Sequence, residues 1–160
     1  MWDRSCDCFA VGTKEDGVTR NHYLALDAQL WPLMVLPGAA KQFSGAAKTA
    51  ETQLNYDVGF SYSEAKEGLW TEGTAQAALF MELSGQETEA KSLLAAVGTM
   101  QAADGSYFAS STRDLPTGFM LETDPTQPRQ YFHIAHLAAV SWTAIASHRL
   151  NPFTRNSLLP

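Results

Sequence analysis

Three segments of the chain are apolar at almost every position. They span residues 26–36, 71–83 and 131–150. A helix that is apolar on all sides is normally buried on all sides. The pattern therefore predicts three inner helices that contact protein all around. In the first of them, Pro32 is tolerated only in an opening turn, which favours a start nearer Trp31 than Asp27.

Two further segments place apolar residues on one face only. Residues 44–56 carry a stripe that includes Ala46, Ala50 and Leu54, and residues 87–100 carry another. Both are typical of amphipathic helices. Buried and amphipathic helices thus alternate along the chain, which predicts antiparallel hairpins in an inner and an outer layer. A plain helical bundle would explain the stripes but not the alternation.

The remaining segments have no clear period. Residues 1–25 predict an irregular lead-in, residues 110–130 contain three prolines and predict a long loop, and residues 154–160 predict a flexible tail. The sequence therefore predicts one all-α domain over residues 1–153. All its inner helices would point the same way, so that their N-terminal ends share one rim with the long loops.

Composition and charge narrow the function classes. A chain of 160 residues can form one domain with its own core. The net charge of -6 is spread along the chain without a basic stripe, so we expect no nucleic-acid partner. No apolar run reaches membrane-spanning length, so we expect no membrane partner. Cys6 and Cys8 are too close in sequence to bridge easily, which predicts two reduced thiols and slightly favours the cytoplasm.

Three runs at the predicted starts of the inner helices resemble a known family. They are LDAQLW (26–31), GLWTEGTAQ (68–76) and HLAAVSW (136–142), followed by NPF (151–153). Together they resemble the C-terminal part of six-hairpin glycosidase-like (α/α) toroid proteins, and the Trp-x-Glu-Gly-Thr-Ala-Gln run is the most specific of them. The resemblance implies helical hairpins around a cavity, with carbohydrate bound at one end by aromatic platforms and carboxylates.

Two acidic residues suit that chemistry. Glycoside hydrolysis uses a pair of carboxyl groups, one of which has a raised pKa. Glu72 lies beside the indole of Trp70 at the start of the second inner helix and fits the acid. The helix N-terminus would instead favour ionised Glu72, which argues for a base or a ligand-positioning role. Asp27 is the second candidate, with a helix N-cap as the alternative.

Other polar and aromatic residues of the same rim are candidates for binding substrate. The rings can stack on sugars or pack in the core, the amides can bind hydroxyls or satisfy backbone, and the histidines can bind a ligand or loop carbonyls. The candidates are Trp31, Gln29, Trp70, Gln76, Tyr131, His133 and His136. A metal at the two histidines would need a third ligand, and the sequence predicts no metal and no cofactor.

The predicted fold is therefore all-α, with antiparallel hairpins that form about half of an (α/α)6 toroid. An open ring would expose apolar surface, so we expect either a longer polypeptide or association with another chain or a second copy. The expected function is that of a carbohydrate-active protein, a candidate glycoside hydrolase that acts on an oligosaccharide or polysaccharide. The alternative is a non-catalytic structural or binding fragment that assembles with another chain to complete the toroid.

Overall fold

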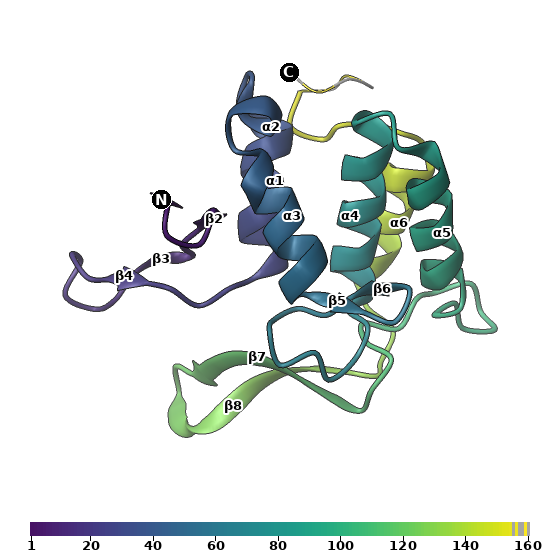
Figure 1. Cartoon of the computed structure of the whole chain (residues 1–160). Coiled ribbons are helices and arrows are strands. Elements are labelled where there is room, and N and C mark those ends of the chain that lie inside the picture. The colour runs from purple at the N-terminus through teal and green to yellow at the C-terminus, as the bar shows by residue number, and fades with distance from the viewer. Residues whose placement is uncertain (155, 157–158, 160) are drawn as a thin grey trace.

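The structure of the chain, a computed structural model, describes residues 1–154, 156 and 159. The five predicted helices are present, and a short sixth, α2, lies between the first two (Figure 1). The helices are α1 (Leu26–Val35), α2 (Ala39–Gln42), α3 (Ser44–Gln53), α4 (Thr71–Leu83), α5 (Glu87–Gly98) and α6 (Leu137–Ser147). Helix α1 begins at Leu26, so Pro32 lies inside it rather than in its opening turn.

The prediction of an all-α fold is wrong. Strands make up 24% of the chain against 38% for helices, so the chain is an α/β mix. The strands form four separate two-stranded antiparallel sheets. These pair β1 (Trp2–Asp3) with β2 (Cys8–Phe9), β3 (Gly12–Thr13) with β4 (Arg20–Asn21), β5 (Asn55–Tyr56) with β6 (Gly59–Phe60), and β7 (Asp114–Leu121) with β8 (Asp124–Phe132).

The longest hairpin, β7–β8, occupies the segment predicted as a loop. Its prolines indicated loop because proline cannot donate to a strand ladder. In a two-stranded sheet, however, each strand has a free edge, where proline is tolerated. Gly118 has a φ of +79° and lies where the register of the pair shifts, as in a β-bulge. Because of these features, the segment does not show the strict alternation of apolar and polar residues by which a strand is recognised in a sequence.

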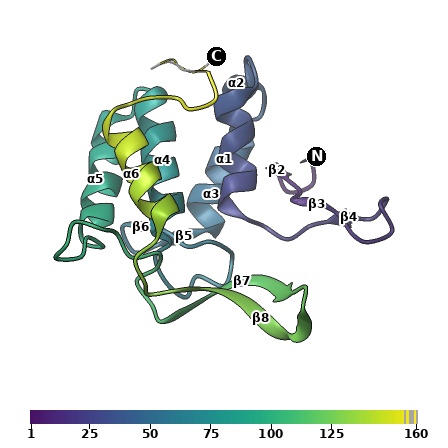
Figure 2. The ribbon, with the colours of Figure 1, turned by 180° about the vertical axis from the view of Figure 1, so that it is seen from behind.

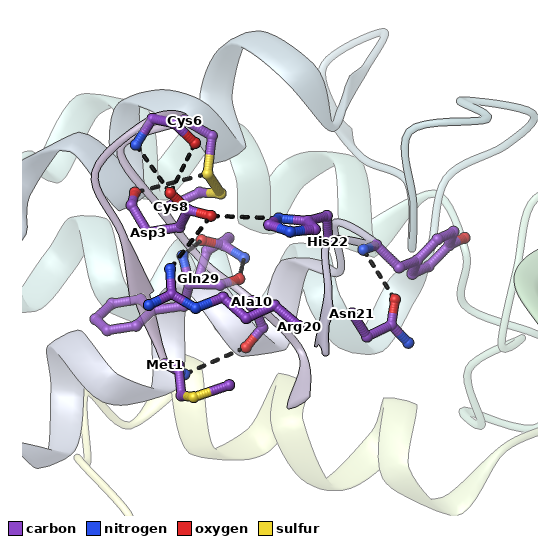
Figure 3. A network of polar contacts seen from close by, with 12 residues as sticks. Met1, Asp3, Cys6, Cys8, Ala10, Arg20, Asn21, His22 and Gln29 are labelled. Atoms are coloured by element: carbon purple, nitrogen blue, oxygen red, sulfur yellow. Dashed lines mark hydrogen bonds and ion pairs between the residues drawn. A yellow bond between two sulfur atoms is a disulfide. The ribbon is translucent and has the colours of Figure 1, made fainter. Parts of the chain in front are cut away.

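The first residues form two small hairpins in the segment predicted as an irregular lead-in. The expectation of two reduced thiols is wrong. Cys6 and Cys8 are joined by a disulfide (Figure 3). Asp7 between them has a φ of +49°, and this left-handed turn brings the two Cα atoms to 5.2 Å. The cysteine spacing therefore gives no argument for a reducing compartment.

Hydrogen bonds hold this N-terminal segment against α1. The Gln29 side chain is fully buried, accepts a bond from Phe9 N at 2.7 Å and donates one to Phe9 O at 2.8 Å (Figure 3). Asp3 faces the side chains of Arg20 and His22 at 3.5 and 3.3 Å. These contacts fix the β1–β2 and β3–β4 hairpins beside the start of α1.

Helices α1, α4 and α6 run in the same direction, and α3 and α5 run the opposite way (Figures 1 and 2). The N-terminal ends of α1, α4 and α6 lie at the end of the molecule that also carries the β7–β8 hairpin. This arrangement gathers the first turns of three helices, which are far apart in sequence, at one end of the fold.

Helix α4 is the centre of the core. It contacts α1, α5 and α6, and every residue from Gly73 to Met81 is buried. A Cβ atom at Gly73 would lie 2.1 Å from the Trp70 ring and 2.8 Å from Leu26. Glycine at this position therefore lets the start of α4 approach α1 closely, and this approach places the neighbouring Glu72 near the first turn of α1.

The other two apolar helices are not buried on all sides. Helix α6 buries Ala139, Thr143 and Ala146 but leaves Leu137 81% exposed. Helix α1 leaves Trp31 and Val35 partly in solvent. Helix α1 contacts α2, α3 and α4, and α6 contacts α4 and α5. These neighbours leave one face of each helix exposed, so the prediction of burial on all sides is wrong for α1 and α6.

The segment after α6 returns to α1. Asn151 is fully buried, and its amide donates to Met34 O in the last turn of α1 at 2.9 Å. Residues 155, 157, 158 and 160 of the predicted flexible tail lie outside the described residues. Within that tail, Leu159 packs against the core. The side chain of Asn151 therefore holds the segment after α6 against the last turn of α1.

Candidate functional site

A pair of carboxyl groups lies where α1 and α4 begin. Asp27 is in the first turn of α1 and Glu72 in the first turn of α4, and both are partly buried. The pKa of Glu72 is raised from 4.5 to about 7, first by burial and second by the negative charge of Asp27. Burial also raises the pKa of Asp27, against the hydrogen bond that it accepts from Ala28 N at 2.7 Å. The two carboxyl groups therefore influence each other.

Burial of Glu72 outweighs the effect of its helix. The positive end of a helix dipole favours an ionised carboxylate by about 0.3–1 kcal/mol in exposed positions. The pKa of Glu72 is raised instead, because loss of water around the carboxylate and a nearby like charge both favour the protonated form. Glu72 thus has the character of an acid that still holds its proton near neutral pH, rather than of a base.

Gln76 connects this acid to α1. Its side chain is fully buried, accepts a hydrogen bond from Trp31 Nε1 at 2.9 Å and donates one to Glu72 Oε1 at 3.3 Å. Because the indole N–H can only donate, it fixes the amide oxygen of Gln76 on its own side and the amide nitrogen toward Glu72. Gln76 therefore orients one carboxyl oxygen of Glu72 and has little capacity left for a ligand.

A first aromatic cluster, formed by Tyr62, Trp70 and Tyr131, lies beside the carboxyl pair. The ring centroids are 4.7 to 5.6 Å apart. Burial first and the charge of Glu72 second raise the pKa of Tyr131 to about 12, and burial and Asp27 likewise raise the pKa of Tyr62. The two phenols therefore remain protonated donors. Trp70 is only 1% exposed and serves as the floor of the cluster.

A second aromatic cluster is formed by Trp31, Trp142 and Phe153. Trp31 donates to Gln76, which in turn donates to Glu72, so hydrogen bonds link this cluster to the acid. The Trp31 ring stacks on the Trp142 ring with 6.1 Å between centroids, and its centroid is 5.8 Å from that of Phe153. Trp31 and Phe153 are each 37% exposed, so this cluster presents aromatic surface to a ligand.

Unpartnered polar atoms mark the same helix ends. Thr71 Oγ1 and His136 Nδ1 are buried and have no hydrogen-bond partner among the described residues. Trp70 Nε1 lies near the Tyr131 hydroxyl but does not reach hydrogen-bond geometry with it. The His136 ring meets the Tyr131 ring edge-on, with 5.8 Å between centroids. Buried polar groups normally have partners, so a water molecule or a ligand can satisfy these atoms.

Two of the predicted binding residues are engaged elsewhere. The Gln29 side chain is bonded at both ends to the backbone of Phe9. The His133 ring stacks on Phe108 at 4.0 Å, and its Nδ1 contacts Ser110 O at 2.6 Å. Neither side chain joins the carboxyl pair. The structure does bring Asp27, Glu72, Trp31, Trp70, Gln76, Tyr131 and His136 into one connected site.

Three site residues were missed from the sequence. Tyr62 has no role in the sequence analysis. Trp142 and Phe153 enter it only within the runs that resemble the family, without a binding role. An extended pairing places Tyr62: Ala25, just before α1, bridges Ser63. No local signal could have shown this bridge, because its partners are separated by a whole helical hairpin.

Within the described part of the chain, no group of three or more His, Cys, Asp and Glu side chains is arranged to hold a metal ion. None of the described helices combines the length and the apolarity needed to cross a membrane.

A scan against protein-family models finds no match, and searches of the curated proteins and of the solved structures find none either.

Proposed function

We propose that the protein is a glycoside hydrolase whose acid is Glu72 and whose second carboxylate is Asp27. The observation that supports this most strongly is the pair itself: two carboxyl groups from the first turns of two helices, one with a pKa raised to about 7. Glycosidases need one carboxyl group that keeps its proton and one that is ionised. The resemblance of the GLWTEGTAQ run to six-hairpin glycosidase-like proteins points the same way.

The roles follow from the surroundings of each group. Glu72 donates its proton to the glycosidic oxygen as the bond to the anomeric carbon breaks. Asp27 supplies the carboxylate that attacks this carbon or activates a water molecule. Tyr131 remains a protonated donor for sugar hydroxyls, and the exposed ring of Trp31 offers a stacking surface. Gln76 is a positioning residue, because it holds Glu72 Oε1 and leaves the other oxygen for the proton.

The test is hydrolysis of nitrophenyl glycosides and of a panel of oligosaccharides by wild type, Glu72→Gln and Glu67→Gln. Glu67 is an exposed glutamate of the loop before α4 and serves as the matched control. We expect Glu72→Gln to lose at least about 100-fold in rate on the oligosaccharides, whose leaving sugar needs the proton, and Glu67→Gln to keep full activity. Wild-type activity should fall as pH rises past about 7, where Glu72 loses its proton. Equal rates for the two variants would refute the assignment.

A second candidate function is a non-catalytic fragment that assembles with another chain. The observation that favours it is the uncovered apolar surface around α6, where Ile134 is 57% and Leu137 81% exposed. Contiguous apolar surface of this kind is typical of interaction sites. Sedimentation of wild type and Leu137→Asn discriminates between the two. A concentration-dependent association that the variant abolishes, without any glycoside hydrolysis, would favour assembly.

A further inference from the structure

A groove of about 410 Å³ runs along the exposed side of α1. Its lining follows the helix at a spacing of four residues, with Asp27 and Ala28 first, Trp31 and Pro32 next, and Val35 and Leu36 last. Phe153 closes it from the segment after α6. Residues four apart share a helix face, so the groove extends over nearly the whole length of α1, about 14 Å.

Among the described residues that line the groove, polarity is confined to one end. Asp27 is the single ionisable residue of this set, and its other side chains are aliphatic or aromatic. Val35 is 39% and Leu36 49% exposed at the far end. An apolar channel that ends at a carboxyl group is complementary to an amphipathic ligand whose polar part lies at that carboxyl group.

The groove and the carboxyl pair share Asp27, whereas Glu72 lies outside the lining of the groove. Trp31, which lines the middle of the groove, is bonded through Gln76 to Glu72. This bond holds the nitrogen edge of the indole toward the site and fixes the plane of the ring. We propose that the groove binds the apolar aglycone of an amphipathic glycoside, an alkyl or aryl glycoside, whose sugar lies at Asp27 and Glu72. The proposal rests on the proposed function and names its substrate class.

A small-molecule occupant fits the groove better than a second protein chain does. The volume of the groove lies within the range of small-molecule sites. At one end of the groove, a ligand can form a hydrogen bond with Asp27. The apolar surface on α6 is separate, since neither Ile134 nor Leu137 lines the groove. The two uncovered surfaces therefore have different occupants and can be tested apart.

The test compares hexyl with methyl glycosides, using the α- and β-glucosides, galactosides and mannosides as probes in calorimetric titrations. Each buried methylene contributes about fourfold to affinity when fully covered, and about twofold in an open groove. Five additional methylenes should therefore strengthen binding by about 30-fold for at least one sugar. Val35→Ser should weaken the hexyl glycoside at least about threefold and leave the methyl glycoside unchanged. Val18→Ser, an exposed valine away from the groove, is the matched control.

A second variant, Leu36→Asn, should have the same selective effect, and circular dichroism checks that both variants are folded. Equal affinity for hexyl and methyl glycosides of every sugar would overturn the aglycone proposal, while hydrolysis lost in Glu72→Gln would still uphold the proposed function. Binding of 1-hexanol as tight as that of every hexyl glycoside would show that the sugar adds nothing to affinity, and it would overturn the aglycone proposal. A dimer of the wild type that Leu36→Asn dissociates, with no change in the hexyl preference, would assign this face to a second copy and overturn the proposal.

Discussion

Replacing Glu72 by glutamine should stabilise the protein above neutral pH. The pKa of Glu72 is raised from 4.5 to about 7 in the folded state, so folded protein binds this proton more tightly than unfolded chain does. A raised acidic pKa stabilises the fold in the protonated form. Its contribution is fully present below about pH 4.5 and is lost as pH rises to about 7. Above that range the fold carries the cost of a poorly solvated carboxylate.

The size of the effect follows from the same shift. A rise from 4.5 to about 7 corresponds to ~3 kcal/mol. The side chain keeps partial contact with solvent, which screens the charge, so ~2 kcal/mol is the expected gain in the free energy of unfolding at pH 8. Glutamine keeps the shape and an oxygen that can accept the Gln76 bond, but it carries no charge. The gain should therefore shrink toward zero at pH 4.

The assay is urea unfolding of wild type, Glu72→Gln and the control Glu67→Gln at pH 4, 6 and 8, followed by circular dichroism. Comparing variants at each pH cancels the titration of all other groups. A gap that opens between pH 4 and 8 for Glu72→Gln alone is the expected outcome. If Glu72→Gln is equally or less stable than wild type at pH 8, burial does not raise this pKa and the acid assignment is refuted.

Three other substitutions test the carboxyl pair and the packing at the start of α4. Asp27→Asn removes the like charge, so the pKa of Glu72 should move below about 7, which carbon NMR of the labelled glutamate carboxyl group measures; an unchanged titration would mean that the two groups do not interact. Gly73→Ala places a Cβ 2.1 Å from the Trp70 ring and should destabilise the fold by about 3 kcal/mol. Gly98→Ala, which meets nothing within 4 Å, should instead stabilise it by about 0.5 kcal/mol, and thermal unfolding that fails to separate the two alanine variants would contradict the packing argument.

The helices could be predicted because their signals are local. The apolar run of α4, its glycine-rich start and the stop at Ser84 and Gly85 all lie within one segment, and the observed helix ends at Leu83. Proximity of Asp27 to Glu72 also followed from local patterns, because alternating buried and amphipathic helices require the buried ones to run in one direction. Helix burial was overestimated for α1 and α6, because periodicity reports a face that avoids water but not whether a neighbour covers it.

The strands and the hydrogen-bond network could not be predicted, because they depend on partners distant in sequence. Strands of two residues, such as β5 and β6, are too short to show a period. In β7–β8 the prolines concealed the pairing. The role of Gln76 depends on the indole of Trp31, 45 positions away. From the sequence Gln76 is a candidate for binding a ligand, whereas in the structure its amide orients Glu72. The left-handed turn at Asp7, which closes the disulfide, has no signal in the residue types around it.

Helix α4 carries one further partly buried acid, and the comparison shows what distinguishes Glu72. Glu82, near the other end of the helix, pairs with Arg149 at 3.0 Å, the usual arrangement for a carboxylate that serves structure. Within the described part of the chain, Glu72 has no such ion pair and instead lies near a second carboxylate, although a lysine or arginine there would stabilise the fold. Glu72 is instead held by the amide of Gln76 and lies near protonated tyrosines. Such surroundings lower the stability of the fold when Glu72 is ionised, and they suit an acid that donates a proton. The proposed role as a proton donor accounts for this arrangement in the first turn of α4, whereas a role in stability does not.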